Sequence, residues 1–136
     1  MPSDLAAAAE TAYRAFAARD AELMREVCHP EVEIDVPTAA VAGREGPYRG
    51  PDAIGDYLAD IERVWDELEL RPHEFVDAGE GRVVVLGRVI TRRGRTRNDL
   101  PSVWVLEFRD DLVYRVHVYS DAAQVAASIE GGGPRL

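Results

Sequence analysis

The stretch that decides the fold is residues 101–125, which read PSVWVLEFRDDLVYRVHVYSDAAQV. Two apolar runs rich in Val, Trp, Phe and Tyr flank a polar turn at residues 109–112. Aromatic and β-branched runs on either side of a short polar turn are typical of an antiparallel hairpin. Ser120 and Asp121 follow the second run and are good helix-starting residues. The stretch therefore predicts a hairpin followed by a helix.

Strand patterns continue on the N-terminal side of this hairpin. Residues 69–78, 82–92, 99–109 and 113–120 predict successive strands joined by short turns. Residues 31–37 alternate strictly between polar and apolar side chains, which predicts a half-buried strand. Its apolar face holds Val32, Ile34 and Val36, and its polar face holds Glu31, Glu33 and Asp35.

Apolar residues at helical spacing predict helices over about residues 3–19, 20–28 and 51–68. The third pattern is the clearest. Its core stripe is Ile54, Leu58, Ile61, Trp65 and Leu68, and its outer face carries Asp56, Asp60, Glu62 and Asp66. Residues 37–50 contain three glycines and two prolines, so they predict a loop over the mouth of a pocket.

Helices first and an antiparallel sheet afterwards predict an α+β fold, with the helices gathered on one face of the sheet. The chain has 136 residues, of which 46% are hydrophobic. That length fits one domain over residues 1–136 with a real core, and we expect residues 1–3 and 129–136 to be loose ends.

The charge balance bears on the partners that the chain can have. A net charge of -9 argues against nucleic acid, because phosphate binding needs a basic surface. Residues 81–98 nevertheless carry six arginines and no acid, whereas residues 51–80 hold ten acids and two arginines. This contrast predicts a solvated hairpin facing an acidic helix, with an anion-recruiting rim as the alternative. Asp99 is expected to pair with Arg97 or Arg88.

Absent residue types exclude some chemistry. All sixteen basic residues are arginine, which rules out lysine Schiff bases and a phosphate-loop lysine. Cys28 is the single cysteine and cannot form an internal disulfide. The alanine-rich N-terminus lacks the pattern of a signal peptide, and no stretch approaches membrane-spanning length. We therefore expect a cytoplasmic protein that does not bind membranes.

Three local patterns carry a resemblance to a known family. They are residues 29–32 (HPEV), residues 48–54 (YRGPDAI) and the closing hairpin. With the order of the elements, they resemble SnoaL-like polyketide cyclases and the surrounding ketosteroid isomerase-like superfamily. The resemblance implies a curved sheet of four to six strands wrapped round three helices, forming a cone with one apolar pocket. Isomerases, cyclases, dehydratases, epoxide hydrolases and non-catalytic binding proteins share that scaffold, so the site must decide the reaction.

The resemblance also implies where catalytic groups would lie. Steroid isomerases of this superfamily keep an aspartate base just before a proline at the end of the first strand. That position falls on Val36 here, with Asp35 one residue earlier; a bulge would be needed to turn Asp35 inward. Relatives place an aspartate or histidine where this chain has Trp104 and Val118. The resemblance therefore implies an unusually apolar pocket, and neither steroid isomerase nor limonene epoxide hydrolase activity.

The polar residues that remain supply three candidate catalysts. Asp35 and His73 are candidate weak bases, and Tyr13 is a candidate hydrogen-bond donor. The alternatives are a solvated Asp35, a solvent-facing His73 and a core aromatic role for Tyr13. His117 is interpreted as a surface or dimer-interface residue. We expect the ligand pocket to be lined by Phe16, Val36, Tyr57, Leu58, Trp65, Trp104, Val116 and Val118.

Two functions remain open at this point. The first is an isomerase, cyclase or dehydratase that acts on an apolar polyketide- or terpenoid-like substrate. The second is a non-catalytic protein that binds a small apolar or aromatic ligand or acts as a dimeric partner. We expect no metal, because no histidine has a second ligand at metal spacing, and no organic cofactor, because the sequence has no dinucleotide fingerprint or phosphate loop. The outer sheet face is also apolar, which predicts a homodimer through that face.

Overall fold

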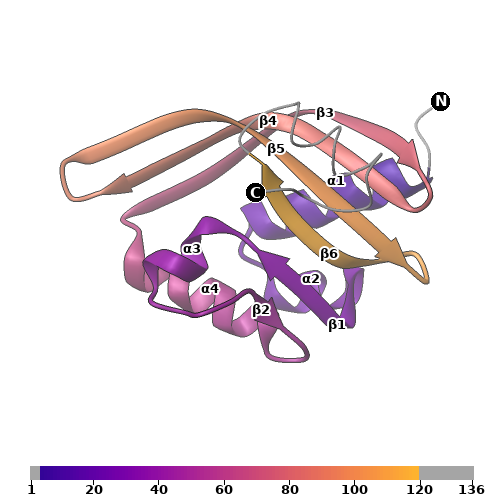
Figure 1. Ribbon diagram of the computed structural model, residues 1–136, viewed down its shortest axis with the longest axis horizontal. Coiled ribbons are helices and arrows are strands. Elements are labelled where there is room, and N and C mark those ends of the chain that lie inside the picture. The colour runs from indigo at the N-terminus through magenta and orange to yellow at the C-terminus, as the bar shows by residue number, and fades with distance from the viewer. Residues whose placement is uncertain (1–3, 120–136) are drawn as a thin grey trace.

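The computed structural model describes residues 4–119 and has an α+β fold (Figure 1). The helices are α1 (Asp4–Ala17), α2 (Ala21–Val27), α3 (Pro37–Val41) and α4 (Ala53–Val64). The strands are β1 (Cys28–Asp35), β2 (Tyr48–Arg49), β3 (Glu67–Gly79), β4 (Arg82–Arg93), β5 (Thr96–Arg109) and β6 (Leu112–Tyr119). No helix among these residues is long and apolar enough to cross a membrane.

The six strands form one curved, unclosed sheet in the order β2-β1-β6-β5-β4-β3. Neighbouring strands run antiparallel, except that β1 and β6 run parallel. Antiparallel pairing, predicted for the strands that follow the helices, is confirmed for β3 to β6, and the sequence interpretation missed this parallel pair. It arises because β1 comes from the helical half of the chain and joins the sheet beside its last strand. The pairing sets Asp35 next to His117.

The helices pack on one face of the sheet and enclose the main core. α1 packs on β3 and β4, and α4 packs on β1 and β2. The side chains between these layers include Phe16, Ile54, Ile61, Val83, Val85, Leu106 and Val113, all buried. Burial of each large side chain stabilises the fold by about 2 kcal/mol. The alternation predicted for β1 is confirmed, since Val32 and Ile34 are buried.

Three parts of the sequence interpretation were wrong. Residues 37–50 hold the short helix α3 and the short strand β2, and not only a loop. The helix predicted over residues 51–68 ends at Val64, because Trp65 is already extended and the Asp66 amide donates to the Arg92 carbonyl, which starts β3. Asp60 was assigned to the outer face, but its residue is only 4% exposed. The helix predicted from Ser120 and the loose ends predicted at residues 1–3 and 129–136 lie outside the described residues.

Candidate functional site

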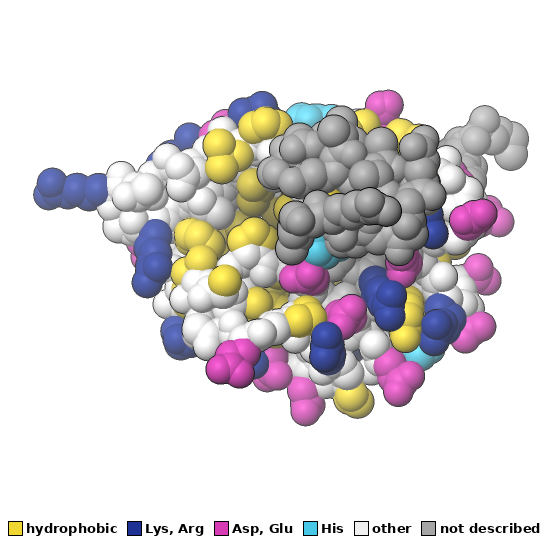
Figure 2. All heavy atoms as spheres, in the orientation of Figure 1, with side chains coloured by type: hydrophobic (Ala, Val, Ile, Leu, Met, Phe, Trp, Pro, Cys, Tyr) yellow, Lys and Arg dark blue, Asp and Glu magenta, His cyan; other side chains and the backbone are white. Residues whose placement is uncertain are grey.

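A cavity of about 550 Å³ lies between the sheet and the layer formed by α3 and α4. Its wall is mostly apolar. The apolar lining residues are Val36, Pro37, Trp65, Leu68, Leu70, Val89, Leu100, Pro101, Trp104 and Val118, and the polar ones are Thr38, Tyr57, Thr91, Asn98, Ser102, His117 and Tyr119. Figure 2 shows hydrophobic side chains gathered between the projecting β4–β5 hairpin and the helices. The volume suits a drug-sized molecule.

A second cavity, of about 70 Å³, lies deeper in the core. Val36, Tyr57, Leu70 and Trp104 line both cavities, so they form the partition between them. The remaining wall of the small cavity includes Tyr13, Phe16, Cys28, Leu106 and Val116. Burial raises the pKa of the Cys28 thiol to about 12, so this cysteine stays a neutral, unreactive part of the wall at neutral pH.

Aromatic rings build the partition. The Tyr13 ring meets Trp104 edge-on at 5.6 Å between centroids, and the Phe16 ring stacks on Tyr57 at the same distance. Burial raises the pKa values of Tyr13 and Tyr57, so both phenols stay protonated at neutral pH. Within residues 4–119 neither hydroxyl has a hydrogen-bond partner. Both are therefore available to donate a hydrogen bond to a ligand oxygen.

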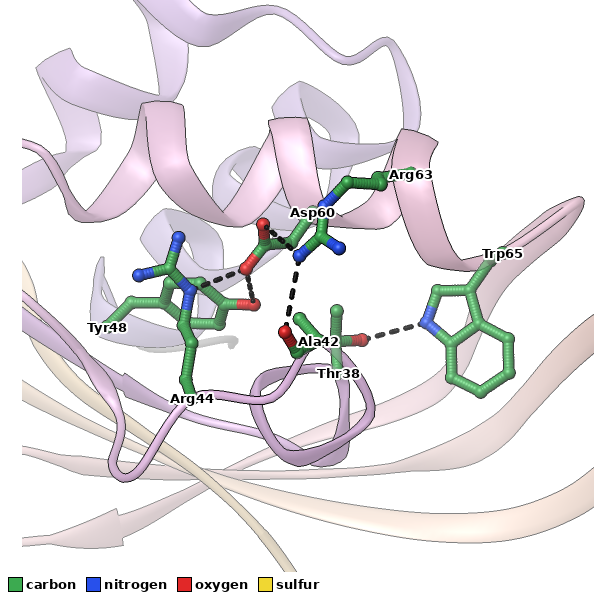
Figure 3. A network of polar contacts seen from close by, with 7 residues as sticks. All are labelled: Thr38, Ala42, Arg44, Tyr48, Asp60, Arg63 and Trp65. Atoms are coloured by element: carbon green, nitrogen blue, oxygen red, sulfur yellow. Dashed lines mark hydrogen bonds and ion pairs between the residues drawn. The ribbon is translucent and has the colours of Figure 1, made fainter.

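A polar network holds α3 and the loop after it against α4 (Figure 3). The carboxylate of Asp60 accepts from Arg44 Nε at 2.5 Å and from the Tyr48 hydroxyl at 2.8 Å. Its other oxygen accepts from Arg63 at 3.3 Å, and Arg63 also donates to the Ala42 carbonyl. The hydrogen bond from Arg44 lowers the pKa of Asp60, so this carboxylate is ionised at neutral pH. The side chains of Arg44, Tyr48, Asp60 and Arg63 do not line the large cavity. Their role is to hold α3, which does line it, in place against α4.

The same layer fixes one edge of the mouth. The Trp65 indole Nε1 donates to Thr38 Oγ1 at 3.0 Å, and both residues line the large cavity. Thr38 is only 4% exposed. The indole is therefore held in one orientation by a hydrogen bond between the end of α4 and α3. The sequence interpretation missed Thr38, because a threonine in a presumed loop has no distinguishing pattern.

A histidine and a carboxylate lie side by side on the outer face of the sheet, because His117 pairs with Asp35 of β1 and with Val105 of β5. His117 Nδ1 lies 2.9 Å from Asp35 Oδ2, and His117 is among the lining residues whereas Asp35 is not. Both side chains remain accessible, at 36% and 50% exposure. The sequence interpretation treated His117 as a surface or interface residue and missed this pair. Only the parallel β1–β6 register brings the two residues together, and no spacing within the sequence signals it.

The other predicted site residues are distributed as follows. Val36, Tyr57, Trp65, Trp104 and Val118 line the large cavity. Tyr13, Phe16 and Val116 line the small one. Leu58 packs against the core without lining either cavity, and His73 is exposed on β3, outside both linings. Residues 4–119 contain no group of three or more His, Cys, Asp or Glu side chains placed to hold a metal ion.

A model of the SnoaL-like domain matches residues 9–116. The chain belongs to this family. The SnoaL-like domain is a small-molecule-binding scaffold, and its specific activity depends on the lining residues. In this SnoaL-like domain, Trp104 and Val118 do line the cavity, and none of the lining residues in the described part of the chain is an Asp or Glu.

Solved structures show the same fold. The protein TerC, co-crystallised with polyporic acid, is 29% identical and superposes with a TM-score of 0.76 over 94% of this chain and 99% of its own. An NTF2-like protein of unknown function from Burkholderia pseudomallei is 23% identical, with a TM-score of 0.75 over 93% of this chain and 98% of its own. A hypothetical protein with a ketosteroid isomerase-like fold from Catenulispora acidiphila, in complex with trimethylamine, is 13% identical, with a TM-score of 0.67 over 93% of each chain. A search of curated proteins found no match to this SnoaL-like domain.

Proposed function

We propose that this SnoaL-like domain binds a flat apolar or aromatic small molecule in the large cavity. The observation that carries the proposal is a cavity of about 550 Å³ walled by Val, Leu and Trp side chains, with no Asp or Glu among its lining residues within 4–119. A hydrophobic wall with a few placed polar groups is how small-molecule sites are built. TerC, which is similar in fold and sequence, was co-crystallised with polyporic acid, and this supports an aromatic ligand.

Filling the cavity is expected to abolish binding. Both tryptophans of the chain line the cavity, so intrinsic fluorescence reports its occupancy. We expect polyporic acid to quench this fluorescence in the wild type. Val89 lines the cavity, and V89F should raise the Kd at least about tenfold, which is 1.4 kcal/mol of binding free energy.

The matched control is V76F. Val76 pairs with Val84 on the opposite face of the same sheet, is 39% exposed and lines neither cavity. Its substitution should leave the Kd within about twofold of the wild type. Saturable quenching that V89F leaves intact would place the ligand elsewhere, and no saturable quenching at all would refute binding of this ligand class.

We propose proton transfer as a second function, because His117 is among the residues that line the cavity and the Asp35 carboxylate lies beside its imidazole. With its proton on Nδ1, which lies 2.9 Å from the Asp35 carboxylate, His117 would have the Nε2 lone pair free to accept a proton. A ketone ligand would lose a proton from its α-carbon to Nε2, and the resulting enolate would regain a proton from the imidazolium at the same or another carbon. The protonated Tyr57 phenol, which also lines the cavity, would donate to the enolate oxygen. This is isomerase or cyclase chemistry without a cofactor.

The roles of the three predicted catalysts differ under this proposal. Asp35 acts as a positioning residue through His117, whereas Tyr13 lines only the small cavity and does not meet a ligand in the large one. His73 has no role in it, because it is exposed on β3 outside both cavities. Replacing His73 is therefore a control for replacing His117.

Deuterium exchange tests the proton transfer. We expect the protein to accelerate exchange at the α-carbon of 2-tetralone in D₂O, followed by NMR. H117Q should lower the rate by about 10²–10⁴-fold while leaving the Kd for polyporic acid unchanged. H73Q should catalyse the exchange at the wild-type rate. Exchange that survives H117Q would exclude His117 as the base, and no acceleration in the wild type would favour the purely binding function.

We also propose a homodimer through the outer face of the sheet. Val84 pairs with Val105 and Leu86 pairs with Val103 on the face opposite to the helices. Leu86 on this face is 36% exposed. An apolar face of this kind is typical of an interface between two copies. A cytoplasmic location stays a prediction.

Sedimentation measures this assembly directly. The wild type should sediment at twice the mass of one chain, and L86E should sediment as a monomer, because a carboxylate in the contact would be desolvated. Leu100 is also exposed, at 54%, but lines the cavity on the inner face, so L100E should stay dimeric. A monomeric wild type, or a dimeric L86E, would reject this interface.

A further inference from the structure

The β4–β5 arm, formed by residues 88–101, projects beyond the helices and carries basic side chains toward its free end (Figures 1 and 2). Along β4 the alternate residues Val89 and Thr91 line the cavity. Thr91 pairs with Asn98, which also lines it, and Arg93 pairs with Thr96 at the end of the arm. Since side chains alternate along a strand, Arg93 is the next side chain on the cavity face.

The distance suits a contact with a ligand at the mouth. Two residues of a strand span about 7 Å, so Arg93 is rooted about 7 Å beyond Thr91. An arginine side chain is of comparable length and can lie back along the strand toward the mouth. The sheet wall therefore changes from apolar at Val89, through the neutral polar pair of Thr91 and Asn98, to cationic at Arg93.

Two of the other arginines on the arm are already engaged by acids. Arg88 donates to Asp99 at 2.7 Å, which confirms one of the two pairs expected from the sequence. Arg92 lies 3.5 Å from Asp66 and 3.8 Å from Glu67. Arg93 has neither an ion pair nor a hydrogen bond within residues 4–119. Its guanidinium is thus an unpaired cation on a chain whose net charge is -9.

We propose that Arg93 selects amphipathic ligands whose outer end is anionic, such as an aromatic carboxylate or enolate. The inference rests on the proposed binding function and adds the class of ligand. The apolar part of the ligand would fill the cavity, the hydroxyl of Thr91 and the amide of Asn98 would meet its polar edge, and the guanidinium would hold the anion. A guanidinium binds a planar carboxylate with two parallel hydrogen bonds, so it favours this geometry over a neutral amide.

A matched pair of ligands tests the selection. Biphenyl-4-carboxylate and biphenyl-4-carboxamide have the same skeleton and differ in charge. We expect the wild type to bind the carboxylate about tenfold more tightly than the amide, measured by calorimetry at 0.15 M salt, where exposed charges beyond about 8 Å are screened. R93Q should bring the two Kd values within about twofold of each other, mainly by weakening the carboxylate.

R97Q is the matched control. Arg97 lies on the same arm and pairs with Arg92, on the face away from the cavity, so its removal changes the net charge equally. R97Q should keep the tenfold preference, and equal unfolding midpoints of the two variants and the wild type would show that both fold. If both ligands bind the wild type equally, or if R97Q loses as much preference as R93Q, the assignment to Arg93 is wrong. If neither ligand binds, the binding function itself is wrong for this class.

Discussion

Replacing Gly87 with alanine should destabilise the fold by about 3 kcal/mol, although the change adds one methyl group. Gly87 lies in β4 opposite Pro72, where β3 shifts its register between Pro72 and Glu74. A Cβ on residue 87 would collide with the Arg71 carbonyl oxygen and come within 2.8 Å of Pro72 Cα. Both of these atoms are backbone, so the strand itself would have to move.

Urea unfolding measures this loss, and G55A is the control. Gly55 lies in α4, where an added Cβ would come no closer than 3.5 Å to the flexible Arg25 guanidinium. Alanine is favoured over glycine in a helix by about 1 kcal/mol, so G55A should be neutral or more stable. A G87A protein as stable as the wild type would show that the backbone of β3 does not lie as close to Gly87 as described.

Asp60→Ala should cost about 2 kcal/mol of unfolding free energy. Removing one partner of a fully buried ion pair costs about 3–5 kcal/mol, but Arg44 and Arg63 are 38% and 61% exposed and can be hydrated again. The Tyr48 hydroxyl cannot, because Tyr48 is 2% exposed and Asp60 is its partner. The expected loss of unfolding free energy is therefore about 2 kcal/mol, below the cost for a fully buried pair.

The matched variant is D56A, one helical turn earlier on the exposed side of α4, which should change stability by less than about 0.5 kcal/mol. The contribution of Asp60 should also depend on pH. Because folding lowers its pKa from 3.8, its stabilisation is present above about pH 4 and is lost as the pH falls through the folded-state pKa. The difference between wild type and D60A in urea melts should therefore shrink in acid. A difference that is independent of pH would contradict the network in Figure 3.

Local patterns predicted most of the fold. The long strands and the closing hairpin followed from apolar runs and turns, and the faces of β1 followed from strict alternation, since neighbouring residues alone decide these features. The burial of Asp60 could not be predicted, because it depends on Arg44 and Tyr48, which come from a loop and a two-residue strand. Periodicity predicts which face of its own helix or strand a side chain lies on. It does not predict which other segments of the chain pack against that face.

The site divides in the same way. Most of the predicted pocket residues are apolar side chains on the inner faces of elements, and all of them except Leu58 line one of the two cavities. His117 and Arg93 gain their positions from strand register, and Thr38 gains its contact with Trp65 from the packing of α3 beside the end of α4. Asp35 was singled out in the sequence, but its partner His117 was not, because the two belong to opposite ends of the described chain.

The parallel pairing of β1 with β6 constrains the order in which the chain can fold. β3, β4 and β5 are joined by short turns and can pair as soon as they are made. β1 is synthesised early but finds β6 only after nearly all of the described chain has emerged. Closing so long a loop is slow, so the last event should be the docking of the N-terminal helices and β1. The large cavity should therefore form at the end of folding, because its wall is incomplete in a nascent chain until β6 has paired with β1.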